Sequence, residues 1–309
     1  MSTPFPFGAT STGEDVTAGV DLTGRTAVVT GASSGLGAET ARVLARRGAR
    51  VVLAVRDVAA GQRVAAQLPG EVAVEPLDLA DLASIDAFTG RWSGPLHVLV
   101  DNAGVMATPF GRTAQGWETQ FGTNHLGHFA LTCGLRNSLA AAGDARVVVL
   151  SSVGHINGDV DLDDPNFERG GYEPWLAYGR SKTANILFAV EAARRWAGDG
   201  IAVNALNPGR IASTNLSRHV PASAAPASFD PNGRTGISVK DIPQGAATSL
   251  LLAASPLVAG ITGRYFEDCQ IAEPHVDGVR RGVAAYAIDP DRARALWALS
   301  EELVAEART

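Results

Sequence analysis

The stretch "TGASSGLG" (30–37) lies between an apolar run, "RTAVVT" (25–30), and a segment with helical spacing of apolar residues, "GAETARVLARRG" (37–48). The run predicts a buried strand and the segment predicts a helix closed by a glycine. Glycines gather at many turns for steric reasons alone. Between a strand and a helix, however, they let backbone N–H groups and the helix N-terminus approach a phosphate. The stretch therefore predicts a phosphate-binding turn at the start of an α/β fold.

Strands and helices alternate along the rest of the chain. Short apolar runs predict further strands at 50–55, 71–77, 96–100, 146–150, 201–206 and 261–266. Helical patterns fill the gaps at 58–68, 82–92, 113–141, 178–197, 241–254 and 290–305. Continuous apolar runs are typical of strands buried on both faces, and regular alternation favours a doubly wound parallel sheet. We expect a polar N-terminal arm at 1–20 and one Rossmann-type α/β domain at 21–309.

The amino-acid composition of the chain argues against several classes of protein, such as nucleic-acid-binding, secreted and membrane proteins. The chain has 309 residues, 46% of them apolar, and a net charge of −6. This acidic balance provides no basic surface for nucleic acid. Cys133 and Cys269 are far apart and fit no disulfide framework, so we expect a reducing, cytoplasmic setting. No export signal and no membrane-spanning run is recognisable in the sequence.

Polar and glycine-rich residues follow six predicted strands: "TGASSGLG" (30–37), Arg56 with Asp57, Asp78, "DNAG" (101–104), Ser151 with Ser152, and "NPG" (207–209). Ligands of open α/β sheets bind outside the carboxyl ends of the strands. These residues are therefore expected to line one site. A guanidinium at Arg56 suits the 2′-phosphate of NADP, whereas a carboxylate at Asp57 would suit the ribose of NAD.

"LAYGRSKTANILF" (176–188) places Tyr178 and Lys182 on one face of a helix. A free tyrosine with a pKa near ~10 exchanges its proton poorly at neutral pH. A neighbouring ammonium favours the phenolate, so we expect Lys182 to lower the pKa of Tyr178 and make it a usable general acid or base. A surface tyrosine beside a solvated lysine is the simpler alternative for the motif taken alone.

Together these motifs resemble the short-chain dehydrogenase/reductase family, from about Asp21 to the C-terminus. Thr30 to Gly37 match its glycine motif, Asp101 to Gly104 its N-N-A-G motif, and Tyr178 with Lys182 its Y-x-x-x-K motif. "NHLGHF", "SSVGH", "GRYFEDC" and "VRD" are similar to the retinol dehydrogenase and protochlorophyllide reductase branch. We expect no N-terminal hydrophobic anchor of the kind that the membrane-anchored retinol enzymes carry. Asp101 replaces an asparagine that mainly supports the sheet.

The resemblance implies roles for four residues. Tyr178 would protonate the carbonyl oxygen during reduction, and Lys182 would also bind the nicotinamide ribose. Ser152, chosen over Ser151, would stabilise charge on that oxygen. Asn124 would hold a water that connects Lys182 to solvent, or it could serve only as a hydrogen-bonding residue within its helix.

NADP(H) is the cofactor that the resemblance and Arg56 favour. Its expected contacts are Gly31, Ser33, Ser34, Gly35, Leu36, Gly37, Arg56, Asp78, Leu79, Asn102, Ala103, Gly104, Tyr178, Lys182, Pro208, Gly209, Ile211 and Ser213. The expected reaction interconverts a hydrophobic ketone or aldehyde and its alcohol. Reduction of a conjugated C=C bond and a non-catalytic NADP(H) sensor or scaffold are the alternatives. A homodimer through helices 113–141 and 178–197 is possible.

Two long irregular stretches, 153–176 and 214–239, are expected to form loops beside the substrate. Candidate wall residues, for which core packing is an equal alternative, are Met106, Phe110, Trp175 and Leu216. We expect no metal site. His125 and His128 lack a third ligand, and "DVDLDD" (159–164) lacks the glycine and distal glutamate of an EF-hand, so we expect a solvated acidic loop there.

Overall fold

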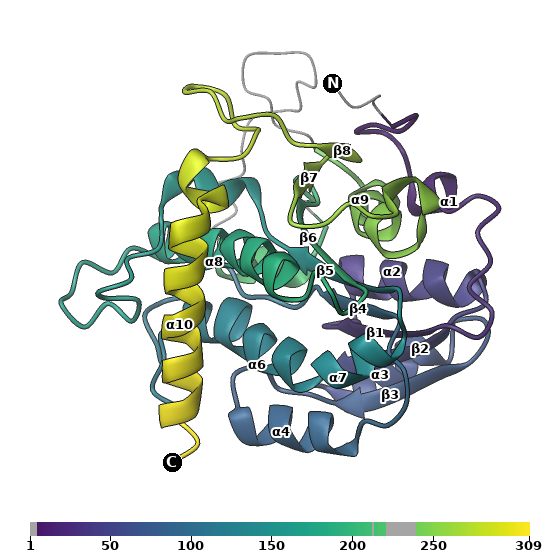
Figure 1. The fold of residues 1–309 in the computed structure, drawn as a ribbon, viewed down its shortest axis with the longest axis horizontal. Helices are drawn as coiled ribbons and strands as arrows, with labels where there is room; N and C mark the ends of the chain where they lie inside the picture. The colour runs from purple at the N-terminus through teal and green to yellow at the C-terminus, as the bar shows by residue number, and fades with distance from the viewer. Residues whose placement is uncertain (1–4, 212, 221–238) are drawn as a thin grey trace.

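A computed structural model describes residues 5–211, 213–220 and 239–309. Its centre is an eight-stranded sheet of order β3-β2-β1-β4-β5-β6-β7-β8 (Figure 1). The strands are β1 Thr26–Thr30, β2 Arg50–Val55, β3 Val72–Pro76, β4 Val98–Asp101, β5 Ala145–Leu150, β6 Ile201–Asn207, β7 Tyr265–Glu267 and β8 Gln270–Ile271. All neighbours pair in parallel except β7 and β8. The strand order reverses between β1 and β4, which opens a crevice at their carboxyl ends.

Helices cover both faces of the sheet, which confirms the doubly wound α/β fold. One core packs α1 Gly13–Val16, α2 Gly35–Arg46 and α9 Ile242–Ala254 against the sheet. The other packs α4 Leu82–Arg91, α6 Gly127–Gly134, α8 Pro174–Arg195 and α10 Pro290–Glu306. The remaining helical segments are α3 Val58–Ala65, α5 Thr119–Phe121, η1 Gly122–Leu126, α7 Arg136–Ala141, η2 Val153–Asn157, η3 Asn215–His219, η5 Pro256–Val258 and η6 Ala285–Ile288.

The structure corrects three predicted boundaries. The helix predicted at 113–141 is divided, because a turn closes at Trp117 and Glu118 then caps α5 by accepting hydrogen bonds from two backbone N–H groups. The helix predicted from Tyr178 begins at Pro174, with Glu173 as its N-cap. The last predicted strand, 261–266, is shifted to β7. Residues 221–238, most of the loop expected at 214–239, lie outside the described residues.

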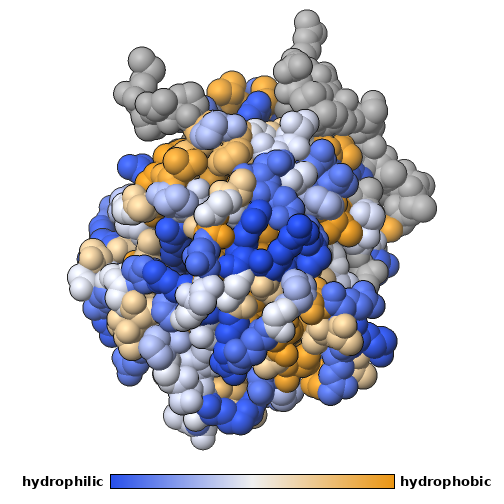
Figure 2. Space-filling view, turned by 90° about the vertical axis from the view of Figure 1, so that its right-hand side faces the viewer, coloured by the Kyte–Doolittle hydropathy of each residue, from blue (hydrophilic) through white to orange (hydrophobic). Residues whose placement is uncertain are grey.

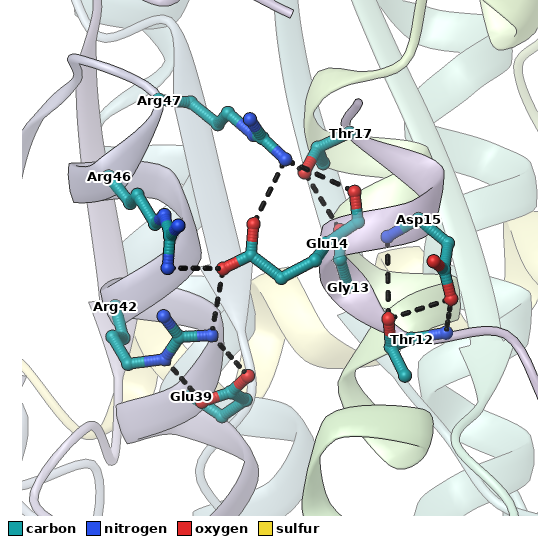
Figure 3. A network of polar contacts seen from close by, with 9 residues as sticks. All are labelled: Thr12, Gly13, Glu14, Asp15, Thr17, Glu39, Arg42, Arg46 and Arg47. Atoms are coloured by element: carbon teal, nitrogen blue, oxygen red, sulfur yellow. Dashed lines mark hydrogen bonds and ion pairs between the residues drawn. The ribbon is translucent and has the colours of Figure 1, made fainter. Parts of the chain in front are cut away.

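The described part of the N-terminal arm packs onto the domain. Gly13 of α1 lies so close to α9 that a Cβ there would be 2.2 Å from Leu250. Glu14 bridges to α2, where its carboxylate lies 3.1 Å from Arg42 and 3.5 Å from Arg46 (Figure 3). The guanidinium of Arg47 also lies 2.9 Å from the Glu14 carboxylate. Figure 2 shows the side of the molecule on which α1 lies in Figure 1, with hydrophilic residues gathered in a band between more hydrophobic areas.

The C-terminal helix α10 covers the outer face of α8 (Figure 1). Its Trp297 is buried and stacks on Phe188, with ring centroids 5.8 Å apart, and meets Phe129 of α6 edge-on at 4.9 Å. The faces of α6 and α8 around these rings are therefore already occupied within the chain. None of the helices in the described ranges has the length and apolar character needed to span a bilayer.

Asp101, the residue that departs from the family motif, is buried at the end of β4. Its Oδ2 accepts a hydrogen bond of 2.9 Å from Thr132, while Oδ1 has no partner among the described residues. Burial raises the pKa of Asp101 to about 8. The folded protein therefore favours the protonated carboxyl far more than the unfolded chain does, where the pKa is about 3.9.

Replacing Asp101 by Asn tests this. The stabilisation linked to the proton is complete below pH ~4 and is lost as the pH rises through the folded-state pKa of about 8. The free energy of unfolding of the wild type should thus fall relative to Asp101→Asn across that range, as measured by urea unfolding at several pH values. The exposed Asp163→Asn is the control. Wild-type and Asp101→Asn curves that stay parallel would contradict the buried acid.

Candidate active site

A cavity of about 770 Å³ opens at the carboxyl ends of the strands. It collects nearly all of the residues singled out from the sequence: Gly31, Ser33, Ser34, Gly35, Leu36, Gly37, Arg56, Asp78, Leu79, Asn102, Ala103, Gly104, Ser152, Tyr178, Lys182, Pro208, Gly209 and Ile211. Ser213 is exposed and is not among the lining residues, and Asn124 lies buried behind the wall. Residues from six separate loops thus meet in one place.

The turn after β1 fits a phosphate-bearing ligand. Gly31 has a φ of +66°, and a Cβ there would lie 2.9 Å from Ala103. A Cβ at Gly37 would lie 2.7 Å from the carbonyl oxygen of Gly31. The N-cap of α2, Ser34, makes no side-chain capping bond, so the first N–H groups of the helix remain available to a ligand.

Thr30 joins this turn to the end of β4. Its Oγ1 accepts hydrogen bonds of 2.9 Å from the backbone N–H groups of Asn102 and Ala103. Asn102 in turn donates from Nδ2 to the Thr30 carbonyl at 2.7 Å. The two strand ends that border the crevice are therefore fixed relative to each other.

His128 extends the network to the next helix. Its Nδ1 lies 3.0 Å from the carbonyl oxygen of Asn124, and its Nε2 lies 2.9 Å from Oγ1 of Thr30. Burial lowers the pKa of His128 to about 4, so the ring is neutral. Because a carbonyl only accepts, the proton belongs on Nδ1, and Nε2 accepts from the Thr30 hydroxyl.

Asn124 lies in the π-helical turn η1 and is fully buried. Its Nδ2 donates to the Val105 carbonyl and to Oγ of Ser181, each at 2.9 Å, and its Oδ1 accepts from the Val105 N–H at 2.8 Å. Three of the four hydrogen-bonding positions of the amide are therefore used by protein partners. The side chain ties the loop after β4 to α8, and the water-holding role expected for Asn124 stays a prediction.

Lys182 is buried, and its Nζ donates a hydrogen bond of 3.0 Å to the carbonyl of Leu150 at the end of β5. Burial lowers the pKa of Lys182 to about 8. The ammonium lies 5.8 Å from the ring centroid of Tyr178. It faces Gly104. A Cβ at this position would lie 3.6 Å from Nζ, so the glycine leaves room beside the lysine.

Tyr178 is buried as well, and burial raises its pKa to about 12 despite an opposing hydrogen bond from Ser152. The expectation that Lys182 lowers this pKa is not met by the chain on its own, because desolvation of the phenolate is the larger effect. The phenol thus carries its proton at neutral pH. In this state it holds a proton that it could donate, but it is a weaker acid than a free tyrosine and is no base.

The two serines after β5 have different surroundings. Ser151 donates from Oγ to the Lys182 carbonyl at 2.7 Å and so holds α8. Ser152 accepts a hydrogen bond of 3.0 Å from the N–H of Gly154 and reaches the Tyr178 hydroxyl. Gly154 is required there, because a Cβ would lie 2.9 Å from the Tyr178 ring. Ser152 is thus the serine placed beside the phenol.

The two candidate ribose ligands at the end of β2, Arg56 and Asp57, have different contacts. Asp57 is the N-cap of α3, and its carboxylate accepts a hydrogen bond of 2.9 Å from the N–H of Ala60. Arg56 is exposed at the cavity and has no hydrogen-bond or ion-pair partner among the described residues. Asp57 lines the cavity as well, so this edge offers a ligand both the guanidinium and a carboxylate whose Oδ1 is engaged at the helix cap.

Three of the four candidate wall residues, Met106, Trp175 and Leu216, line the cavity. Phe110 does not, because its ring packs against Tyr172 at 5.1 Å, outside the cavity. Arg280 also lines the cavity but was not singled out from the sequence. It lies far along the chain in a segment without a recognisable motif, and only the fold brings it here.

The remaining candidates have structural contacts. Burial lowers the pKa of His125 to about 3, and its Nε2 lies 2.8 Å from Oγ of Ser300 on α10. No group of three or more His, Cys, Asp or Glu residues in the described ranges is arranged to hold a metal. The acidic stretch 159–164 is more than a solvated loop, since Asp159 pairs with Arg292 at 2.8 Å.

Comparisons with known proteins agree with this geometry. A family model described as short chain dehydrogenase matches residues 25–224. The chain belongs to the short-chain dehydrogenase family. A "Probable oxidoreductase" of Streptomyces lividans is 53% identical to this oxidoreductase over 293 residues, which cover 90% of this chain and 97% of that protein.

Relatives place the chain in the retinol dehydrogenase-like branch of the family. Human "Retinol dehydrogenase 14" is 41% identical over 304 residues, covering 91% of this chain and 86% of that protein. The crystal structure of an uncharacterised protein from Mycobacterium paratuberculosis is 40% identical with a TM-score of 0.75 and covers 94% of this chain and 97% of that chain. An NADP complex of RhlG from Pseudomonas aeruginosa is 29% identical with a TM-score of 0.61. The match covers 80% of this chain and 95% of that chain.

Proposed function

We propose that this short-chain dehydrogenase is an NADPH-dependent enzyme that interconverts a hydrophobic ketone or aldehyde and its alcohol. The observation that carries the proposal is the pairing of Tyr178 with Ser152 beside the buried Lys182 in one cavity. Burying a phenol and a lysine beside a hydroxyl costs free energy of folding, which is typical of a functional site. Each of the three groups suits one part of a proton transfer.

The cavity would hold the cofactor along the loops after β1, β2 and β4. The N-terminus of α2 and the glycine turn suit the pyrophosphate, and Arg56 suits a 2′-phosphate. When bound, the nicotinamide supplies the hydride. The loop at Gly104, next to the Lys182 ammonium, would receive the nicotinamide ribose.

The chain's own residues handle the proton. Tyr178 is protonated at neutral pH, since its pKa is about 12, and it would donate its proton to the carbonyl oxygen of the substrate. The Ser152 hydroxyl would hydrogen-bond the same oxygen and orient it. For the reverse reaction the phenolate must be stabilised, which a cationic Lys182 and other positive charge in the closed site would do.

We also propose a cellular compartment and an oligomeric state for the protein. Cys133 and Cys269 are both unpaired, which suits a reducing cytoplasm. The homodimer expected through helices 113–141 and 178–197 would have to use surface that α10 leaves uncovered. Solution mass measurement decides whether such a dimer forms.

Tyr178→Phe removes the proton donor and keeps the ring. We expect kcat to fall at least about a hundredfold, the usual scale for losing a positioned acid, with NADPH affinity retained. Steady-state turnover and NADPH fluorescence titration measure the two effects. Tyr172→Phe, whose hydroxyl lies outside the cavity, is the matched control. Wild-type turnover in Tyr178→Phe would exclude the assigned role.

Arg56→Ala tests the cofactor preference. A charge-assisted pair with the 2′-phosphate contributes about 1.5–3 kcal/mol, so the variant should lose roughly ten- to a hundredfold in kcat/KM for NADPH and much less for NADH. Arg63→Ala, on the exposed surface of the following helix, controls for the loss of one positive charge. Equal losses with both cofactors, or a wild-type preference for NADH, would contradict the assignment.

A further inference from the structure

The rim of the cavity carries a cation that the cofactor does not require. Arg280 lines the cavity from the loop that follows β8, and its Nη1 donates to Oδ1 of Asn157 at 3.3 Å. Asn157 is a neutral amide at the end of η2. No carboxylate of the described residues lies within ion-pair distance of Arg280.

The loop around Arg280 is held in place by buried bonds. The N–H of Gly282 donates to Oε1 of the buried Glu267 on β7 at 2.9 Å. Arg281 lies 3.5 Å from the same carboxylate, so the positive charge of this arginine is balanced by Glu267. The N–H of Ala284 donates to Nε2 of His155 at 3.1 Å. The segment that follows Arg280 is thus anchored to β7 through Glu267 and to η2 through His155.

His155 connects this loop to the proposed catalytic serine. Its Nδ1 lies 2.7 Å from the carbonyl oxygen of Ser152, and burial lowers its pKa to about 4. The neutral ring therefore donates from Nδ1 to that carbonyl and accepts from Ala284 at Nε2. Asn157 also lies close to the catalytic helix, because a Cβ on Gly179 would be 3.5 Å from its Cβ.

Topology separates Arg280 from the phosphates of the cofactor. Arg56 follows β2, whereas the Arg280 guanidinium lies against Asn157 in the segment that follows β5, which is three strands away in the sheet order. At about 4.8 Å per strand this amounts to about 14 Å. The carboxylates that line the cavity among the described residues, Asp57 and Asp78, also lie at the β2 and β3 side. The half of the cavity beside Tyr178 is therefore free of described acidic side chains.

Apolar side chains line the same cavity as the phenol and this cation. They include Met106, Val153, Trp175 and Leu216. The 3₁₀ segment η2 leads from Ser152 to Asn157, and five residues at a rise of about 2.0 Å span about 10 Å. A ligand that meets the Ser152 hydroxyl and runs beside this segment would come to Asn157 and to the Arg280 guanidinium that donates to it.

We propose that Arg280, supported by Asn157, binds a carboxylate at the end of the substrate remote from the carbonyl. The substrate class is then an amphipathic oxo acid, or the matching hydroxy acid, whose acid group is separated from the reacting carbon by an apolar chain. A planar guanidinium matches a carboxylate through two parallel hydrogen bonds. This inference rests on the proposed carbonyl reductase function and adds a specificity-determining residue to it.

The test compares long-chain oxo acids with their methyl esters, which keep the shape and remove the charge. We expect wild-type kcat/KM to favour the acid, and Arg280→Ala to reduce the acid-to-ester ratio by roughly tenfold, mainly through KM. Arg280→Glu should reduce the ratio further. Arg264→Ala, an exposed arginine at the opposite end of β7, should keep the wild-type ratio. An acid-to-ester ratio that Arg280→Ala leaves unchanged would overturn the proposal.

A binding readout separates this proposal from the catalytic one. A saturated long-chain acid has no carbonyl to reduce, so its binding to the NADPH-loaded protein does not depend on turnover. Calorimetry should show tighter binding of the acid than of its primary amide in the wild type, and no such difference in Arg280→Ala. Equal binding of acid and amide by the wild type would refute the subsite, whatever the outcome of the turnover assays.

Discussion

The hydroxyl of Thr30 is the contact on which the site depends. It accepts hydrogen bonds from the N–H groups of Asn102 and Ala103 and donates to His128, so it fixes the crevice where the strand order reverses. His128 and Asn124 carry the same network to Ser181 of α8, whose Oγ donates to the Tyr178 carbonyl at 2.8 Å. A buried polar group left without a partner costs about 1–3 kcal/mol, so the members stabilise one arrangement together.

This network places the phosphate-binding turn and the catalytic helix in one frame. The turn after β1 cannot move without breaking the bonds to β4, and α8 is held further by Lys182 and Ser151 at the end of β5. Burial then has opposite effects on the two titrating groups, since it raises the pKa of Tyr178 to about 12 and lowers that of Lys182 to about 8. Tyr178 of the free enzyme is accordingly protonated but only weakly acidic, and positive charge beside the phenolate would lower its pKa.

Sequence patterns predicted the fold and most of the cavity because they are local. The glycine turn and the Tyr178 motif lie next to strands and on one helix face, where spacing alone determines placement. The pKa of Tyr178 was expected to fall because burial cannot be read from spacing. The contacts of Asn124 and the position of Arg280, which a distant loop brings in, depend on tertiary packing. The packed arm with Glu14 was missed because its helix has only four residues.

The most direct test of the account is deuterium transfer from NADPH labelled at C4 to a long-chain ketone, read by mass spectrometry and NMR of the product. A carbonyl reductase that uses Tyr178 as proton donor should yield an alcohol with one deuterium on the carbinol carbon. With the matching long-chain enone as substrate, deuterium on the β carbon of a saturated ketone product would instead identify a C=C reductase. NADPH binding with no labelled product from any carbonyl would contradict the enzymatic account altogether.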